Sequence, residues 1–216
     1  ASYAITVVKT LFAWLVDQRY LLANPFSGVK MRGASKLRLI DISHAFTEGE
    51  WTLVRTIAND LERSHGWRED AAQRARFLID FSYATGLRPG ELVSLRLGQI
   101  SREEIDGTWW VKVVGKGAKE ATVALPPLGL SALFRYLHAR GVPSNPGEWD
   151  PKAPVVAHLE LPEEGQAAEK ISASRLWAIM ARFFRTVARC CEGLEPPQTA
   201  LAAKLRTASP HWMRHT

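Results

Sequence analysis

The sequence predicts a mainly α-helical protein with a small antiparallel β-sheet, an α+β fold. Apolar residues recur at helical spacing through most of the 216 residues. The exception is a pair of segments rich in β-branched and aromatic residues, 108–114 and 121–125, which are joined by glycines and lysines typical of a hairpin. Because no apolar run approaches the roughly 20 residues that cross a bilayer, we expect neither a membrane span nor a secretory signal.

The first segment predicts an amphipathic helix. Its apolar face comprises Ile5, Val8, Leu11, Phe12, Trp14 and Leu15. Asn24-Pro25 then ends the helix, since the residue before a proline avoids helical backbone. Such a helix cannot bury its apolar face alone, so we expect residues 1–31 to be the last part of a small helical domain and the chain to be a fragment. Residues 32–45, with Arg32, Lys36 and Arg38, predict a basic linker.

Residues 46–216 predict a larger domain that begins with three helices. Thr47 and Glu50 have the spacing of a capping box, so a helix should begin near residue 48. A second helix covers about 69–84 and ends at Gly86, because glycine readily adopts the left-handed conformation of a helix stop. Pro89 suits the first turn of a third helix. Arg88 is therefore held in a tight junction between two helices.

The rest of the domain predicts a hairpin and two further helices. The loop between the strands, residues 115–120, places Lys116 and Lys119 at its tip. Helices should cover about 128–140 and the segment from a cap at Ser172 to Gly193. The intervening residues 141–170 are dense in proline, glycine and glutamate and predict a long irregular segment, to which we assign no chemistry.

Charge and cysteine content narrow the classes of function without deciding among them. Lysine and arginine total 28 against 22 aspartates and glutamates, and this net charge of +6 is compatible with a polyanionic partner. The two cysteines are adjacent, at 190 and 191, so they cannot supply the spaced pairs of a structural zinc site or join distant segments. We therefore expect a reducing, cytoplasmic setting and no metal.

Two basic positions stand where packing does not require them. Arg88 lies between apolar helices, and a guanidinium oriented there by Glu91 suits a phosphate; the alternative is a surface arginine that pairs locally with Glu91. Lys116 and Lys119 in Gly115-Lys116-Gly117-Ala118-Lys119-Glu120 could reach into a DNA groove or toward a bound phosphate; the alternative is a pair of solvated turn lysines.

The last eight residues carry a third basic cluster. If the chain is helical from Pro210, His211 and Arg214 share a face and can converge on one anion. His211 and His215 would share a face as well. However, Trp212 stands where the glutamate of a His-Glu-x-x-His metal motif would be, so we do not expect a metal site.

In this order, the three motifs resemble the tyrosine recombinase (phage integrase) family over nearly the whole chain. The residues that carry the resemblance are Thr85-Gly86-Leu87-Arg88 with Glu91-Leu92, the lysine loop, and His211-Trp212-Met213-Arg214-His215-Thr216. The resemblance implies a C-terminally truncated tyrosine-recombinase catalytic domain, preceded by the end of a helical core-binding domain. One departure is Gly98-Gln99-Ile100, where an acidic residue is expected before Ile100.

The resemblance also implies residue roles. Arg88 and Arg214 would bind the non-bridging oxygens of the scissile phosphate, Lys116 would protonate the departing 5′-oxygen, and His211 would take part in proton transfer. Glu91 and His215 would support these catalytic residues. The residues implied to contact DNA are Arg32, Lys36, Arg38 and Lys119.

The implied activity is site-specific DNA recombination or integration through a 3′-phosphotyrosine intermediate, without a cofactor. Family members form tetramers on double-stranded DNA, and a bacterial or phage origin follows. The nucleophilic tyrosine and a His/Trp box would come after His215, whereas the tyrosines of this chain all precede the Arg214 motif: Tyr3, Tyr20, Tyr83 and Tyr136. We therefore expect these 216 residues to be a monomer in solution that binds DNA without cleaving it.

Three alternatives remain open at this point. The chain could be a non-catalytic DNA-binding remnant or regulator of a recombinase, or a relative of type IB topoisomerases that relaxes supercoiled DNA. It could also be a structural or protein-interaction domain with fortuitous basic turns. Only the last predicts neither a salt-dependent affinity for DNA nor a preference for duplex DNA.

Overall fold

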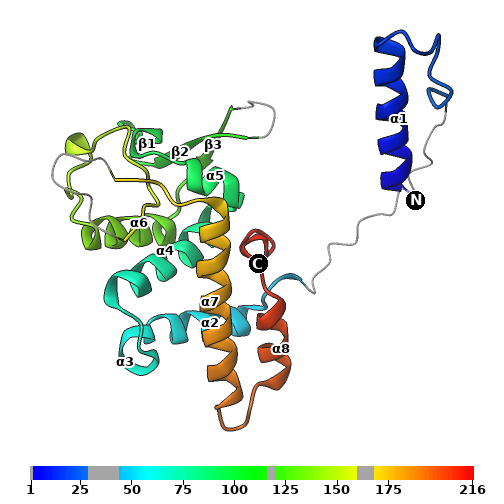
Figure 1. Cartoon of the computed structure of the whole chain (residues 1–216). Helices are drawn as coiled ribbons and strands as arrows, with labels where there is room; N and C mark the ends of the chain where they lie inside the picture. Colours follow the sequence, from blue (N-terminus) through cyan, green and yellow to red (C-terminus); the bar gives the residue numbers. More distant parts are fainter. Residues whose placement is uncertain (1, 29–43, 116–119, 160–167) are drawn as a thin grey trace. The chain divides into compact units, whose positions relative to one another are not determined.

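The computed structural model describes residues 2–28, 44–115, 120–159 and 168–216 (Figure 1). The chain divides into two compact units, residues 1–41 and 42–216. In the first unit, α1 (Ser2–Asp17) is followed by a turn that folds back on it. The Asn24 side chain donates to the carbonyl of Lys9 at 3.1 Å, and the rings of Phe12 and Phe26 lie 5.0 Å apart.

The second unit contains the remaining helices and the sheet, so the predicted fold class, mainly α with a small antiparallel β-sheet, is confirmed. Its α-helices are α2 (Glu48–Ala58), α3 (Leu61–His65), α4 (Glu69–Thr85), α5 (Pro89–Ser94), α6 (Pro127–Ala139), α7 (Ala173–Glu192) and α8 (Thr199–Thr207). Its strands are β1 (Ile100–Arg102), β2 (Trp109–Val114) and β3 (Glu120–Ala124), which form an antiparallel sheet in the order β1-β2-β3. The described residues of this unit also form the 3₁₀ turns η2 (Leu97–Gln99), η3 (Pro146–Glu148) and η4 (Pro210–Arg214).

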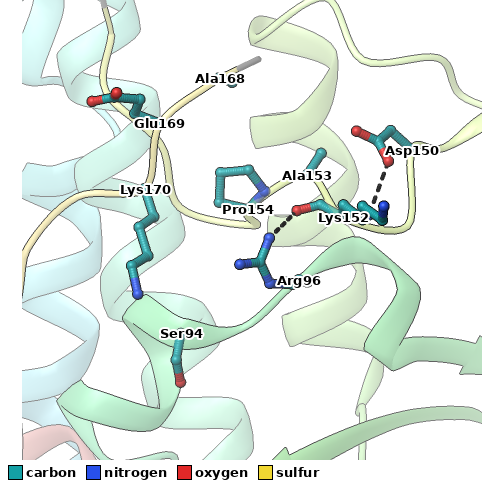
Figure 2. Close-up of a pocket in the computed structure, with 9 residues that line it drawn as sticks. All are labelled: Ser94, Arg96, Asp150, Lys152, Ala153, Pro154, Ala168, Glu169 and Lys170. Atoms are coloured by element: carbon teal, nitrogen blue, oxygen red, sulfur yellow. Dashed lines mark hydrogen bonds between the residues drawn. The ribbon is translucent and has the colours of Figure 1, made fainter.

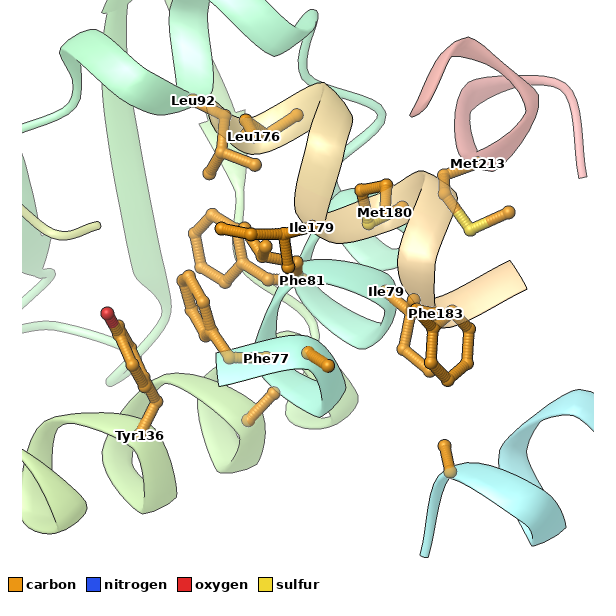
Figure 3. Packing of buried hydrophobic residues seen from close by; sticks show 14 of the residues in the cluster. Phe77, Ile79, Phe81, Leu92, Tyr136, Leu176, Ile179, Met180, Phe183 and Met213 are labelled. Atoms are coloured by element: carbon orange, nitrogen blue, oxygen red, sulfur yellow. The ribbon is translucent and has the colours of Figure 1, made fainter. Parts of the chain in front are cut away.

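Helix α4 forms the centre of this unit. It packs against α2, α6 and α7 and against η4. Figure 3 shows Phe77 and Phe81 of α4 between α6 and α7. The rings of Phe77 and Tyr136 stack at 4.6 Å, and both side chains are at most 1% exposed. Burying aromatic side chains of this size is a main source of stability, and here it fixes the helix that leads into Arg88.

Three of the predicted helix ends have their expected geometry. At the start of α2, Thr47 Oγ1 accepts from the N–H of Glu50 at 3.3 Å, while a carboxylate oxygen of Glu50 accepts from the N–H of Thr47 at 2.8 Å. Helix α4 ends at Gly86, whose φ of 61° is left-handed. Ser172 Oγ accepts from the N–H of Arg175 at 3.1 Å and begins α7.

Other elements were not predicted from the sequence. The short strand β1 and helix α8 were not expected, because three and nine residues carry too little periodicity to stand out. Two antiparallel bridges hold the irregular segment after α6: Arg96 pairs with Pro154, and Ala157 pairs with Lys170. Within the described ranges, no helix is both long and apolar enough to cross a membrane.

Candidate active site

Arg88 occupies the junction between α4 and α5. Its backbone is extended, with φ −70° and ψ 150°, and Pro89 follows as the first residue of α5. Glu91, one turn into α5, accepts from the N–H of Arg88 and from its guanidinium Nη1, each at 2.8 Å. The Arg88 side chain is 55% exposed whereas that of Glu91 is 11% exposed. The carboxylate is thus fixed, and the remaining guanidinium donors stay open to a ligand.

The electrostatic environment keeps Glu91 ionised. Partial burial by itself would raise the pKa of this carboxyl, but the hydrogen bonds from Arg88 and the positive charges of Arg88 and Arg214 lower the pKa below its ordinary value. Glu91 therefore carries its negative charge at neutral pH and attracts both arginines.

Arg214 approaches the same junction from η4. In a 3₁₀ helix, residues three apart eclipse one another, so His211 and Arg214 share a face as predicted. The buried side chains of Trp212 and Met213 anchor this turn in the core. A Cβ at position 86 would lie 4.0 Å from Arg214 Cγ, so the stem of Arg214 passes directly over Gly86.

The register that would pair His211 with His215 is not formed. The turn is 3₁₀ and ends at Arg214, so residues four apart do not share a face as they would in an α-helix. Among the described residues, no three His, Cys, Asp or Glu side chains gather in a way that could hold a metal ion. His215 is exposed at the end of the turn.

A cavity of about 390 Å³ is lined by residues of these elements. Its lining includes Arg88 at the start of α5, Glu91 from α5, Gly115 after β2, Trp177 from α7 and His211 from η4. The Trp177 ring meets the His211 ring edge to face, with centroids 5.8 Å apart. Trp177 was not predicted from the sequence, because on an amphipathic helix it is one more apolar residue; its 41% exposed side chain beside His211 distinguishes it.

Several predicted site residues lie outside the described residues. These are Lys116 and Lys119 in the hairpin loop and Arg32, Lys36 and Arg38 in the linker. Gly115, the last described residue before the loop, lines the cavity. The described end of β2 therefore lies at this cavity.

The tyrosines outside α1 are engaged elsewhere. Tyr136 is 1% exposed, and its hydroxyl accepts from the N–H of Ala157 at 3.4 Å. Tyr83 stacks on Trp51, with ring centroids 4.7 Å apart. Tyr20 lies in the first unit.

Gln99 fills the position where an acidic residue was expected, and its amide makes two hydrogen bonds. Its Oε1 accepts from the N–H of Arg96 at 2.8 Å, and its Nε2 donates to the carbonyl of Lys112 on β2 at 2.9 Å. A carboxylate could make the first bond but not the second, because it has no hydrogen to donate. The amide thus joins η2 to the strand that precedes the lysine loop.

Comparison with known proteins identifies relatives. The sequence model of the phage integrase family matches residues 54–216. Tyrosine recombinase XerC of Xylella fastidiosa (strain 9a5c) is 27% identical over 139 residues, which cover 63% of this chain and 41% of that protein. Tyrosine recombinase XerC of Escherichia coli O6:K15:H31 (strain 536 / UPEC) is 30% identical over 136 residues, or 62% of this chain and 39% of that protein. The chain therefore spans about two fifths of the length of these relatives.

Solved structures include a similar one. It is the XerH site-specific recombinase bound to palindromic difH substrate, in a post-cleavage complex. The TM-score is 0.49 at 20% sequence identity, and the match covers 80% of this chain and 40% of that chain.

Proposed function

The chain belongs to the phage integrase family, and from this premise we propose that it is part of a tyrosine recombinase that cuts and rejoins double-stranded DNA at specific sites. The observation that carries the proposal is the cavity lined by Arg88 and His211, with Arg214 beside it over Gly86. Phosphoryl transfer depends largely on positioned cationic donors, and two arginines with the predicted lysine would provide such donors without a metal.

Each residue has a role in the proposed reaction. A tyrosine oxygen attacks the scissile phosphorus and forms the new P–O bond, while the bond from phosphorus to the 5′-oxygen breaks. Arg88 and Arg214 bind the non-bridging oxygens, on which negative charge accumulates. His211 accepts the tyrosyl proton, and Lys116 donates a proton to the departing 5′-oxygen. The 3′-phosphotyrosine conserves the bond energy, so that a 5′-hydroxyl can reverse the step and rejoin a strand.

The nucleophile is the part of this reaction that the 216 residues do not supply. Every tyrosine of the chain precedes the Arg214 motif, and Tyr136 is buried in the core. We therefore propose that the tyrosine comes from sequence after Thr216 or from a partner subunit of a tetramer on DNA. These 216 residues by themselves should bind duplex DNA and leave it intact.

The test is covalent capture of DNA. Bound sequences are selected from a pool of random duplexes, and nicked versions are offered to a chain lengthened beyond Thr216 to include the downstream tyrosine. We expect a protein–DNA adduct that survives denaturation and disappears in Arg88→Ala and Arg214→Ala. The matched control is Arg63→Ala, on α3, whose side chain is 86% exposed.

Other outcomes would select a different function. An adduct that persists in both arginine variants would contradict the proposed roles. Selective binding without any adduct would indicate a DNA-binding regulator. Relaxation of a supercoiled plasmid that lacks the selected site would indicate a topoisomerase instead.

A further inference from the structure

A second cavity, of about 560 Å³, lies at the other end of α5 from Arg88. Figure 2 shows it between the end of α5, the segment at 150–154 and the segment at 168–170. The polar and charged residues that line it are Ser94, Arg96, Asp150, Lys152, Glu169 and Lys170. No chemistry was predicted for the irregular segment 141–170, and Arg96 belongs to none of the three sequence motifs.

Among the described residues that line the cavity, three side chains are basic and two are acidic. Arg96, Lys152 and Lys170 form no ion pair with any described residue. Asp150 Oδ1 accepts from the backbone N–H of Lys152 at 2.9 Å. The Glu169 carboxylate points away from Arg96 in Figure 2. Positive charge therefore dominates where Arg96 and Lys170 line the cavity.

The Arg96 guanidinium is held in place before any ligand arrives. Its Nη1 donates to the carbonyl of Lys152 (Figure 2). The backbone on either side is fixed too: the N–H of Leu97 donates to the carbonyl of Ala153, and the N–H of Val155 donates to the carbonyl of Leu95, each at 2.9 Å. A guanidinium fixed at one edge presents its other N–H groups in a set direction, which suits the planar approach of phosphate oxygens.

We infer that Arg96 and Lys170 form a second phosphate-binding site, which takes a phosphodiester of the same DNA strand two or three nucleotides from the one bound at Arg88. The inference rests on the proposed function, because it needs DNA at Arg88. The six residues of α5 rise by about 9 Å, at about 1.5 Å a residue. One DNA strand places a phosphate about every 3.4 Å along the helix axis, so a site at this distance matches a phosphate two or three nucleotides away.

The chemistry recognised is a phosphate group, and two sources can provide it: the DNA backbone or free phosphate. A backbone contact positions the duplex and carries no sequence information. The DNA backbone is the source we propose, since the cavity lies at the end of α5, the helix that Arg88 precedes.

The experiment measures duplex binding by the 216-residue chain as a function of salt. Neutralising one phosphate contributes about −0.9 to the log-log slope of affinity against salt. We expect Lys170→Gln, and Arg96→Gln combined with it, to make this slope less steep by about 1, equally on every DNA sequence. Helix α3 contacts the end of α7 that is far from Lys170, where His65 meets Cys190. The control variant Arg63→Gln, on α3, should therefore leave the slope unchanged.

Two variants separate an effect on DNA binding from an effect on folding. The Lys170 side chain makes no hydrogen bond with the described residues, so Lys170→Gln should unfold at the wild-type temperature. Arg96→Lys keeps the positive charge but loses the paired N–H donors of the guanidinium. The salt dependence of duplex binding should therefore stay the same, while the affinity for the duplex falls.

The outcomes separate this inference from the proposed function. No salt-dependent duplex binding by the wild-type chain would contradict the proposed function itself. Wild-type binding with an unchanged slope in both variants would overturn only the second site. An NMR titration with inorganic phosphate at constant ionic strength tests the other source, free phosphate. Phosphate shifts at Arg96 and Lys170 that vanish in the variants, with no change in the DNA slope, would assign the site to free phosphate and overturn the backbone contact.

Discussion

The Glu91 carboxylate accepts two hydrogen bonds from one residue, Arg88: one from its backbone N–H and one from its guanidinium, each at 2.8 Å. The first bond satisfies a donor at the start of α5, and the second orients the side chain proposed to bind the scissile phosphate. One carboxylate thus couples the beginning of a helix to the geometry of the site. Local pairing and a phosphate-binding role, the two interpretations of Arg88 that the sequence left open, are therefore compatible.

Glu91→Gln should weaken both functions of this residue. The amide keeps one acceptor oxygen but loses the charge, so we expect the free energy of unfolding to fall by about 1 kcal/mol. Urea denaturation measures it. Glu103→Gln is the control, since that side chain is exposed and makes no hydrogen bond with a described residue. Equal stability of the two variants would contradict the coupling.

The lowered pKa of Glu91 predicts a specific pH dependence. A carboxyl whose folded pKa lies below its unfolded value contributes stability that is present above the unfolded value, near 4.5, and is lost as pH falls through the folded pKa. The stability difference between wild type and Glu91→Gln should therefore be full at pH 7 and shrink below about pH 4.5. A difference that stays constant down to pH 2 would show that the charge of Glu91 contributes nothing.

Gly86 and Gly49 should respond to alanine with opposite signs. Gly86 has φ 61°, which costs an L-residue about 1 to 2 kcal/mol, so Gly86→Ala should destabilise by about that amount. Gly49 lies within α2 with open space around it, so Gly49→Ala should leave stability unchanged or raise it by up to about 1 kcal/mol. Thermal unfolding of both proteins measures the contrast. Similar shifts in both would remove the left-handed stop as the reason for glycine at 86.

Gln99→Glu should loosen the contact between η2 and β2. The carboxylate still accepts from the N–H of Arg96 but faces the carbonyl of Lys112, so we expect a loss of about 1 kcal/mol. The lost bond should show as faster amide exchange along β2. Gln198→Glu, at an exposed position before α8, is the control. Unchanged exchange on β2 would mean that the sheet is held without this amide.

Arg74 and Arg76 are both buried and should differ sharply when replaced by methionine. Arg74 is 5% exposed, its Nε has no partner among the described residues, and burial lowers its pKa. Arg76 binds Glu62 and the carbonyl of Ala58. Arg74→Met should therefore leave the free energy of unfolding unchanged or raise it. Arg76→Met should lower it by about 2 kcal/mol, because the Glu62 carboxylate loses its partner. Urea denaturation of the two variants measures both effects, and a large loss for Arg74→Met would contradict this ranking.

The sequence predicted the helices that its residues specify locally. Thr47 with Glu50, Gly86 with Pro89, and Ser172 each carry a physical signal for a helix end, and all three ends lie where these signals indicated. It also indicated that His211 and Arg214 share a face. The α-helical register of His211 and His215 was wrong, because the short turn closes as a 3₁₀ helix anchored by buried Trp212.

What the sequence could not predict depends on contacts between distant segments. Trp177 meets His211 only because α7 and η4 pack together, and no periodicity encodes that contact. Likewise, Arg96 and Lys170 line one cavity because two bridges, Arg96 with Pro154 and Lys170 with Ala157, join segments that have no sequence pattern. The predicted roles of Lys116, Lys119 and the linker residues Arg32, Lys36 and Arg38 stay predictions, since they lie outside the described residues.

The most direct test of the central claim is the rate at which the lengthened chain captures DNA covalently, measured for Arg88→Ala, Arg214→Ala and the double variant. If both arginines bind one scissile phosphate, each single variant should lose nearly as much rate as the double variant, because groups that act as a unit are not additive. A single variant that keeps the wild-type rate, or losses that simply multiply, would contradict a shared phosphate site.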